Sequence, residues 1–488
     1  MSGNPLSSVS NPVNSERVET PGRLERRAAK DDRIGQAQYP DHNARIPEHN
    51  QPLIAHPLNA TEHLELAVLR MLDDPSGEQP SILQKLSRRH WNQLLQWLDS
   101  SGIALYFFSS FRQWHHIDIL PDWVRERLQL NLSDNFVRTR SLTEESVAIQ
   151  HEFQQLSVRY AVIKGISLWP HSVPDPALRS QLDLDFLVAE DSAPIARSVL
   201  ERKGYRLYAA TGSSWEFKCN ERPGISIKDL YKDSGSWAVE LHIEPAVNIN
   251  YSRLEWLEMR ELCGMRMPTL SSVDSFIGQG LHVYKNVCAE FLRAAHVWEF
   301  RNAVRSRRHD TDFWNAVRAA AIDNQSVSIR LGVVLLLITE VLGEFAPDSL
   351  TYWTVPLVPT AARIWIRRYG HRSVLGKFPG NKRYLFLQRE LEKAGVCPRR
   401  KLVESLIPTR FPPPIIRPLP NESPAIRFAR SWMQLKFITQ RLRFHLIAGL
   451  DYRRESRLWR KATREIEQSL RRSALSVSAD DSDPERLH

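Results

Sequence analysis

The sequence predicts an α+β protein in which a small mixed sheet is flanked by helical domains on its N- and C-terminal sides. Over residues 158–250, several runs alternate apolar and polar side chains, which is typical of half-buried strands. Before and after this stretch, apolar side chains recur every three to four residues, which is typical of amphipathic helices. The chain of 488 residues is 42% hydrophobic, so it can form a sizeable core and two or three domains.

The N-terminal part of the chain changes character near residue 56. Residues 1–55 are rich in Asn, Pro, Ser, Arg and Asp with few large apolar side chains, so we expect a disordered tail. Residues 56–157 should form an N-terminal helical domain, because segments such as 91–98 show helical spacing. Near its end we expect one helix opening at Pro121 and another over residues 141–157, which leads into the first strand.

Two carboxylates, Asp183 and Asp185, stand at the centre of the predicted sheet. They alternate with Leu182, Leu184 and Phe186, so we predict a strand with one apolar face and one acidic face. Alone, such a pair is more often a solvated edge than a catalytic site. Side chains two positions apart on a strand begin about 6 to 7 Å from each other, however, and can converge on a common cation. A divalent ion would relieve the repulsion between them.

A glycine turn precedes this acidic pair. The apolar run 161–163 ends in Lys164 and Gly165, with Ser167 two residues later. We interpret these residues as a strand, a tight turn and the start of a helix, whose backbone amides could bind phosphate. Arg179, just before the acids, could hold a phosphate or could neutralise the acids as a structural ion pair.

A second alternating run offers a third carboxylate. Residues 237–244 place their apolar side chains on one face and Glu240, His242 and Glu244 on the other. Three carboxylates on adjacent strands beside a glycine turn are what a two-metal phosphoryl-transfer site requires. Asp229, in another alternating run, is a rival to Glu240 for the third position.

In this order, the motifs resemble those of a bacterial nucleotidyltransferase family within the DNA polymerase beta superfamily. The matching motifs are Ile163-Lys164-Gly165, Arg179 with Asp183-Leu184-Asp185-Phe186-Leu187-Val188, Leu200 to Gly204-Tyr205, and Val239-Glu240-Leu241-His242. Weaker similarity extends roughly over residues 60–345. The catalytic and metal-binding residues that the resemblance implies are Asp183, Asp185 and Glu240. The nucleotide-binding residues that it implies are Lys164, Gly165, Ser167 and Arg179. It further implies a cofactor of two Mg²⁺ ions, or Mn²⁺ in their place.

The sequence departs from the family pattern at two positions. Ile166 separates Gly165 from Ser167, where the superfamily has Gly-Ser or Gly-Gly, and Glu240 stands where the third acid is usually Asp. The extra methylene of Glu240 would move its carboxylate outward. We prefer Glu240 over Asp229 for the third position, because the neighbours of Glu240 match the family pattern.

We therefore expect a metal-dependent nucleotidyltransferase that moves an NMP group from an NTP to an acceptor and releases pyrophosphate. Glu240 could also help to deprotonate the acceptor hydroxyl. The acceptor is open, because a small molecule, a protein or an RNA end would all leave the same core motifs. The two departures motivate an alternative, in which the chain is a catalytically degenerate binding or scaffold protein. A third hypothesis is that the chain binds nucleic acid.

Composition limits the location and partners of the chain. The net charge of +10 favours polyanionic partners. Four cysteines without paired spacing are typical of reduced thiols in a cytosolic protein. The most hydrophobic run, residues 331–342, is shorter than the about 20 residues of a membrane span. We therefore expect a cytoplasmic protein without a transmembrane segment.

The C-terminal half should become less compact along the chain. We expect a helical bundle over residues 251–346, a Pro-containing linker region over residues 347–424, and an acidic tail over residues 476–488. Residues 425–475 form a basic amphipathic helical segment. We favour its packing on the helical domain over contact with an anionic membrane surface, and both over binding to a nucleic-acid backbone.

Overall fold

The protein is described by a computed structural model, which divides the chain into two units, residues 1–51 and residues 52–488. All described residues belong to the second unit. They are residues 57–73, 80–211, 213–219, 229–233, 235, 237–245, 252–262, 264–289, 291–376, 380–399, 402–406 and 423–480. The predicted N-terminal tail and most of the predicted acidic tail lie outside these ranges, so both stay predictions.

Helices lead into the sheet from the N-terminal side. In the described part of the chain they are α2 (Ala60–Met71), α3 (Pro80–Gln84), α4 (Arg88–Ser101), α5 (Ala104–Gln113) and α6 (Asp122–Gln155). The two helices predicted at the end of this region are one helix, because α6 runs for 34 residues from its N-cap at Pro121 without an internal Gly or Pro.

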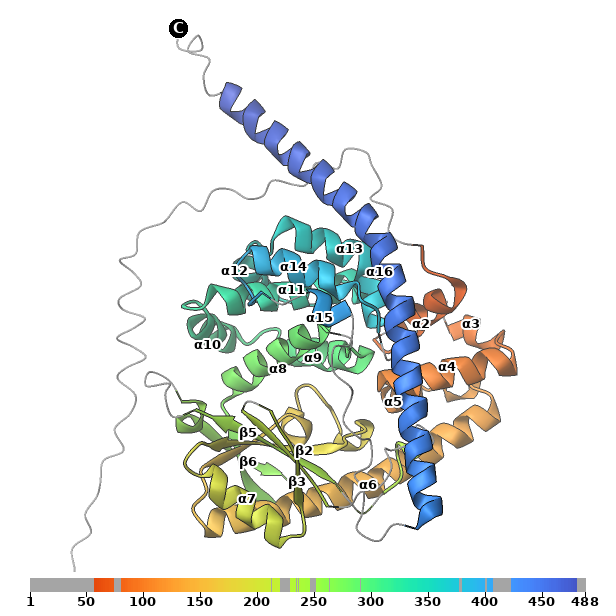
Figure 1. The fold of residues 1–488 in the computed structure, drawn as a ribbon, viewed down its shortest axis with the longest axis vertical. Coiled ribbons are helices and arrows are strands. Elements are labelled where there is room, and N and C mark those ends of the chain that lie inside the picture. The colour runs from red at the N-terminus through yellow and green to blue at the C-terminus, as the bar shows by residue number, and fades with distance from the viewer. Residues whose placement is uncertain are drawn as a thin grey trace, which may run out of the picture. The chain divides into compact units, whose positions relative to one another are not determined.

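One mixed sheet follows, with seven strands among the described residues in the order β3-β4-β5-β2-β1-β7-β6. The strands are β1 (Tyr160–Ile163), β2 (Asp183–Ala189), β3 (Arg206–Thr211), β4 (Ser214–Lys218), β5 (Ala238–Glu244), β6 (Leu257–Leu262) and β7 (Met265–Leu270). The predicted α+β class, a small mixed sheet with flanking helices, is confirmed (Figure 1).

One face of the sheet is covered by α6 and by α7 (Ala193–Arg202) and forms a hydrophobic core with them. The alternation along β2 sends Leu184, Phe186 and Val188 into this core. The ring of Phe186 lies edge-on to those of Phe153 and Tyr160, with centroids 5.5 and 6.1 Å away. Because successive side chains alternate, the acids of β2 leave the opposite face.

The remaining helices follow the sheet. Within the described residues they are α8 (Ser272–Val287), α9 (Ala294–Ser306), α10 (Thr311–Ala321), α11 (Gln325–Leu342), α12 (Asp348–Thr354), α13 (Thr360–Val374), α14 (Tyr384–Lys393), α15 (Leu402–Leu406) and α16 (Pro424–Asp480). Helices before and after the sheet share one hydrophobic core, to which the first turns of α6 also contribute. The long helix α6 therefore joins this core to the core beneath the sheet.

The described residues between 348 and 406 are not the linker that the prolines predict. They contain α12, α13, α14 and α15, and the buried side chains of α12 to α14 belong to the shared helical core. The physical reason is that Pro347 and Pro359 occupy the N-cap positions of α12 and α13. Proline at a helix start leaves no intrahelical hydrogen bond unmade, so it opens these helices.

The helix α11 is the one described helix that is long and apolar enough to cross a membrane. It contacts α8 and α13. Its buried side chains, which include Leu331, Val334 and Ile338, lie in the shared helical core. Its apolar character is therefore explained by packing within the protein.

We predict that Phe186→Ala lowers the free energy of unfolding by about 3 to 5 kcal/mol, because the deleted ring is fully buried between two aromatic neighbours. Chemical denaturation followed by tryptophan fluorescence measures this loss. Phe136→Ala is the control, because that side chain on α6 is 61% exposed and its loss should change stability by less than about 0.5 kcal/mol. Equal losses in both variants would contradict the assigned core.

Candidate active site

The parallel pairing of β2 with β5 builds the centre of the site. In its register Asp185 lies beside Glu240, and Leu187 lies beside His242. Ligand atoms of Asp185, Glu240 and His242 all lie within 4.8 Å of one another. Asp183, two residues earlier on the same face of β2, does not belong to this group of three. The structure therefore brings two of the three predicted acids together and adds a histidine.

Lys164, at the end of β1, supplies positive charge to this group. Its Nζ donates a hydrogen bond of 2.7 Å to Asp185 Oδ1 and lies 3.0 Å from His242 Nε2 and 3.8 Å from Glu240 Oε2. Burial opposes its charge, but the carboxylates of Asp185, Glu240 and Asp183 together raise the pKa of Lys164. The ammonium group is therefore held charged between the two carboxylates.

His242 and Ser214 hold the Glu240 carboxylate. His242 Nε2 lies 3.0 Å from Asp185 Oδ1 and 3.4 Å from Glu240 Oε2. Burial disfavours the imidazolium, but the hydrogen bonds to Asp185 and Glu240 raise the pKa of His242 overall. Ser214 on β4 donates to Glu240 Oε1. The bond to His242, with that to Ser214, keeps the pKa of Glu240 far below its usual value despite burial.

Asp183 has a different environment from the other two acids. Burial, followed by repulsion from Asp185, raises its pKa to about 6, although Arg179 and Lys164 oppose the shift. Among the described residues, no side chain donates a hydrogen bond to its carboxylate. Asp183 therefore carries the least compensated negative charge of the three predicted ligands.

Arg179 is braced by the helical domain. Its Nε donates to both carboxylate oxygens of Glu299 on α9, at 3.1 and 3.4 Å. Tyr106 on α5 donates to Glu299 Oε1 at 3.0 Å. Because Glu299 is buried, its ion pair with Arg179 fixes the position of the arginine. The positive charge of Arg179 still lowers the pKa of Asp183. Arg179 is therefore held by a glutamate that is 120 residues away in the sequence, and not by a direct ion pair with Asp183 or Asp185.

The glycine turn differs from the prediction. Gly165–Leu168 is one turn of 3₁₀ helix and not the start of a longer helix, so phosphate binding by its amides stays a prediction. Ser167 Oγ donates to Lys164 O at 2.8 Å, which commits the hydroxyl to the turn. Gly165 has φ of +43°, and a Cβ there would lie 2.1 Å from Gln181 Nε2. The positive φ favours glycine here, and a side chain would displace the Gln181 amide, whose Nε2 donates to Asp183 O at 2.6 Å.

Asp229 lies away from the acidic group. Its carboxylate is exposed and accepts a hydrogen bond of 3.2 Å from Lys232. The structure therefore favours Glu240 over Asp229 as the third acid.

Two neutral histidines lie on α8 and α9. The rings of His282 and His296 meet edge-on, with centroids 5.4 Å apart. Burial, helped by the charge of Lys164, lowers the pKa of His282 to about 4, and burial also lowers the pKa of His296. Both are therefore uncharged near neutral pH.

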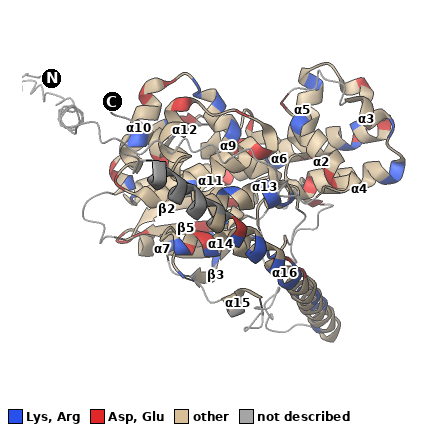
Figure 2. Ribbon diagram, turned by 90° about the horizontal axis from the view of Figure 1, so that it is seen from above, with Lys and Arg blue, Asp and Glu red and all other residues tan. Residues whose placement is uncertain are grey.

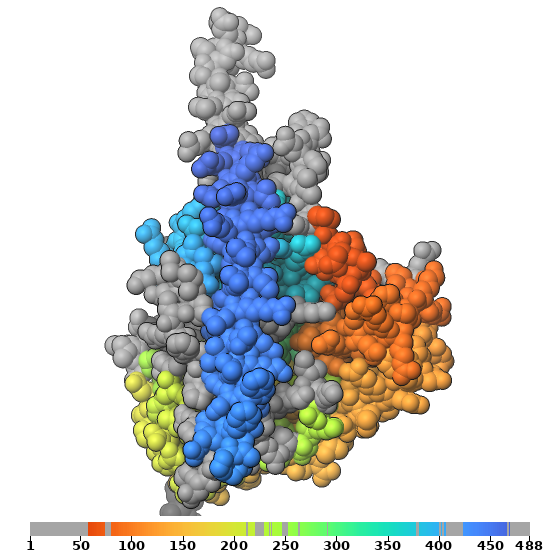
Figure 3. Space-filling model, turned by 45° about the vertical axis from the view of Figure 1, so that its right-hand side comes forward, coloured from red at the N-terminus to blue at the C-terminus, as the bar shows by residue number. Residues whose placement is uncertain are grey.

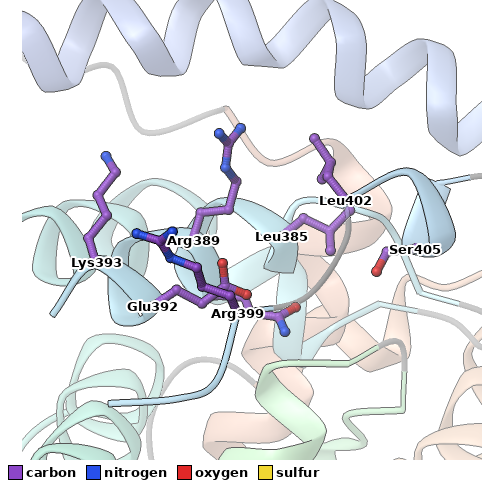
Figure 4. A pocket seen from close by; sticks show the side chains of 8 residues that line it. Leu385, Arg389, Glu392, Lys393, Arg399, Leu402 and Ser405 are labelled. Carbon is purple, nitrogen blue, oxygen red and sulfur yellow. The ribbon is translucent and has the colours of Figure 1, made fainter. Parts of the chain in front are cut away.

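A cavity of about 300 Å³ lies apart from these residues, against α14 and α15 (Figure 4). Its lining is Leu385, Gln388, Arg389, Glu392, Lys393, Arg399, Leu402 and Ser405. None of the predicted site residues lines it. The sequence patterns do not indicate this cavity, because its lining residues follow no motif.

The family model for uncharacterised nucleotidyltransferases matches residues 87–343, which is more than half of the chain. The chain belongs to this family. The matched region of this nucleotidyltransferase family member begins at the N-cap of α4, ends just after α11, and contains every residue of the candidate site. The match thus covers the sheet and the helices α4 to α11, and it leaves out α2, α3 and α12 to α16.

Solved structures give a weaker likeness. An antigenic nucleotidyltransferase-like protein from Paracoccidioides brasiliensis is 13% identical and aligns over 45% of this chain and 96% of its own, with a TM-score of 0.24. No curated protein gives a significant match.

We predict that His282→Asn makes the protein more resistant to mild acid. Because the folded-state pKa is about 4 and the unfolded value is near 6.5, the unfolded state binds more protons between these pH values. Wild-type stability should therefore fall as the pH falls from 6.5 to 4, and the variant should lose less. Melting temperatures over this pH range test the difference, with exposed His309→Asn as the control. If the melting temperatures of wild type and His282→Asn fall equally with pH, the prediction is contradicted.

Proposed function

We propose that this chain transfers an NMP group from an NTP to an acceptor and releases pyrophosphate, using a divalent cation held by acids of β2 and β5. The observation that carries this proposal is the register of Asp185 with Glu240. It gathers two carboxylates and an imidazole in a chain that belongs to a nucleotidyltransferase family.

The residues present suit a divalent cation. Carboxylate oxygens are the ligands of Mg²⁺ and Mn²⁺, and an imidazole nitrogen is accepted by Mn²⁺ more readily than by Mg²⁺. We assign Asp185 and Glu240 as ligands because they lie side by side in the register of β2 with β5. We add Asp183 because it lies on the same face of β2, two residues before Asp185. When bound, the cation would neutralise phosphate charge and make the acceptor hydroxyl more acidic.

The charged side chains around the acids have separate proposed roles. Lys164 is one-third exposed, so its ammonium group can exchange Asp185 for a phosphate oxygen of the nucleotide. Arg179, anchored by Glu299, would stabilise negative charge that develops on the phosphate. Gly165 and Ser167 would act by shaping the turn that carries Lys164.

In the proposed reaction the acceptor oxygen forms a bond to the α-phosphorus. The bond from that phosphorus to the bridging oxygen breaks, and pyrophosphate leaves with the electron pair. The hydroxyl proton passes to solvent. Glu240 is a poor proton acceptor because His242 and Ser214 hold it ionised, so we assign it a ligand role and no role as a base.

One observation favours the alternative of a binding or scaffold protein. Lys164 and His242 already contact Asp185 and Glu240, so the acidic pair is compensated by residues of the chain itself. In that case nucleotide binding would not be followed by turnover.

We predict that the protein transfers a nucleotidyl group in a metal-dependent reaction. Asp185→Asn should lower the rate by about 10² to 10⁴-fold, because losing a carboxylate ligand removes several kcal/mol of transition-state stabilisation. The assay supplies each α-³²P-labelled NTP with Mg²⁺ or Mn²⁺, follows pyrophosphate release, and recovers label in small-molecule, protein and RNA fractions. Asp191→Asn, an exposed acid just after β2, should keep wild-type activity.

Tight nucleotide binding without pyrophosphate release from any acceptor fraction would support the scaffold alternative. Equal activity of wild type and Asp185→Asn would contradict the proposed site. The protein would then be an enzyme whose active site lies elsewhere.

We predict that the assigned ligands can be ranked by Mn²⁺ affinity. Asp183→Asn should weaken binding by more than about 100-fold, whereas His242→Gln should weaken it by roughly tenfold, because we assign His242 to hold the ligating carboxylates. Calorimetric titration measures both. The reverse order would show that His242 takes the ligand position that we assign to Asp183.

A further inference from the structure

The helix α16 has a packed face that fixes its orientation. Its buried side chains recur every three or four residues and are Ala448, Tyr452, Glu455, Trp459 and Ala462. Tyr452 and Trp459 stack on Phe386 of α14, with ring centroids 4.6 and 5.7 Å away. Glu455 accepts a hydrogen bond of 3.0 Å from Tyr369 of α13. These contacts hold one side of α16 against the helical core.

The opposite side of α16 carries an exposed apolar stripe. Its members are each more than half exposed and are Phe428, Trp432, Leu435, Leu442, Leu446 and Leu450. At 3.6 residues per turn, these side chains point within about 40° of one direction, which is opposite to the packed face. In Figure 3 α16 lies in front of the other elements. An exposed apolar surface of this extent is typical of an interaction site.

A basic stripe continues the apolar stripe along the same direction. Its members are exposed and are Arg453, Arg457, Arg460 and Arg464. Over residues 424–464 the helix has eleven Lys and Arg but two acids (Figure 2). Both acids are engaged by the body of the protein, Asp451 with Arg383 and Glu455 with Tyr369. The outward face is therefore apolar along its first half and cationic beyond it.

We propose that this outward face of α16 binds an anionic membrane surface. The apolar stripe would enter the boundary between headgroups and acyl chains, where Trp432 and Phe428 are favoured, and the arginines would contact lipid phosphates. This occupant suits both halves of the face. The inference is independent of the proposed catalytic activity, because α16 lies outside the family match.

Two other occupants suit only one half each. A second copy in antiparallel pairing could cover the apolar stripe, but it would leave the arginine stripe without opposite charge. A nucleic-acid backbone could pair with the arginines, but it offers nothing apolar to the stripe that begins at Phe428. The lipid surface is therefore the occupant that the combined pattern favours.

The test is flotation of the full chain with phosphatidylcholine vesicles that contain or lack phosphatidylserine. We expect binding to the anionic vesicles alone and a decrease with salt. Trp432→Glu combined with Leu446→Glu should lower the bound fraction by about tenfold. The matched control is Leu130→Glu combined with Phe136→Glu on α6, whose side chains are 60% and 61% exposed, and it should bind as wild type does.

Neutralising Arg457 and Arg460 to Gln provides a second variant, which leaves the apolar stripe and the packed face intact and should also reduce vesicle binding. Circular dichroism checks that each variant keeps wild-type helix content. Absence of vesicle binding by wild type would overturn the proposal. A wild-type dimer that the Trp432/Leu446 variant dissociates, without vesicle binding, would assign the face to a second copy. Binding of RNA in place of vesicles would assign it to nucleic acid.

Discussion

The parallel register of β2 with β5 is the constraint on which the site depends. It places Asp185 beside Glu240 on the face of the sheet opposite to the covering helices, so like charges meet in a partly buried place. The fold compensates them with Lys164 from the end of β1 and with His242 from β5 itself. Asp183 remains less compensated, and its raised pKa records the difference. Ligand atoms of Asp185, Glu240 and His242 lie within 4.8 Å of one another, so they are close enough to share a cation.

The surrounding helices hold the site in place. Arg179 lies in a loop and lowers the pKa of Asp183 through its charge. Its position is set by buried Glu299 on α9, which also accepts a hydrogen bond from Tyr106 on α5. The helix α6 contributes to the helical core at its beginning and to the sheet core near its end. The helix α6 thus connects the helical core, which holds Arg179 in place, to the sheet core beneath the strand that carries the two aspartates. Movement of the helical domain relative to the sheet would therefore change the electrostatics of the acids.

The sequence predicts those features that have a local signal. Alternation identifies β2 and β5, and the acid-Leu-His pattern places Glu240 and His242 on one face. Other contacts at the site come from residues that are distant in the sequence: Ser214 of β4 contacts Glu240, and Glu299 of α9 contacts Arg179. Their pairing depends on register and packing, which periodicity does not encode. The prolines mislead for a related reason, because Pro359 can open a helix or occupy a linker, and only the packing of α13 decides between them.

The cation site of Asp185 and Glu240 can be tested directly by anomalous diffraction. The crystals would be grown with Mn²⁺ and an NTP analogue that resists cleavage after the α-phosphate. We expect manganese peaks within about 2.5 Å of carboxylate oxygens of Asp185 and Glu240, with the Lys164 ammonium group moved from Asp185 to the nucleotide. An ordered nucleotide bound elsewhere, with Lys164 still bonded to Asp185 and no manganese between the two strands, would contradict it.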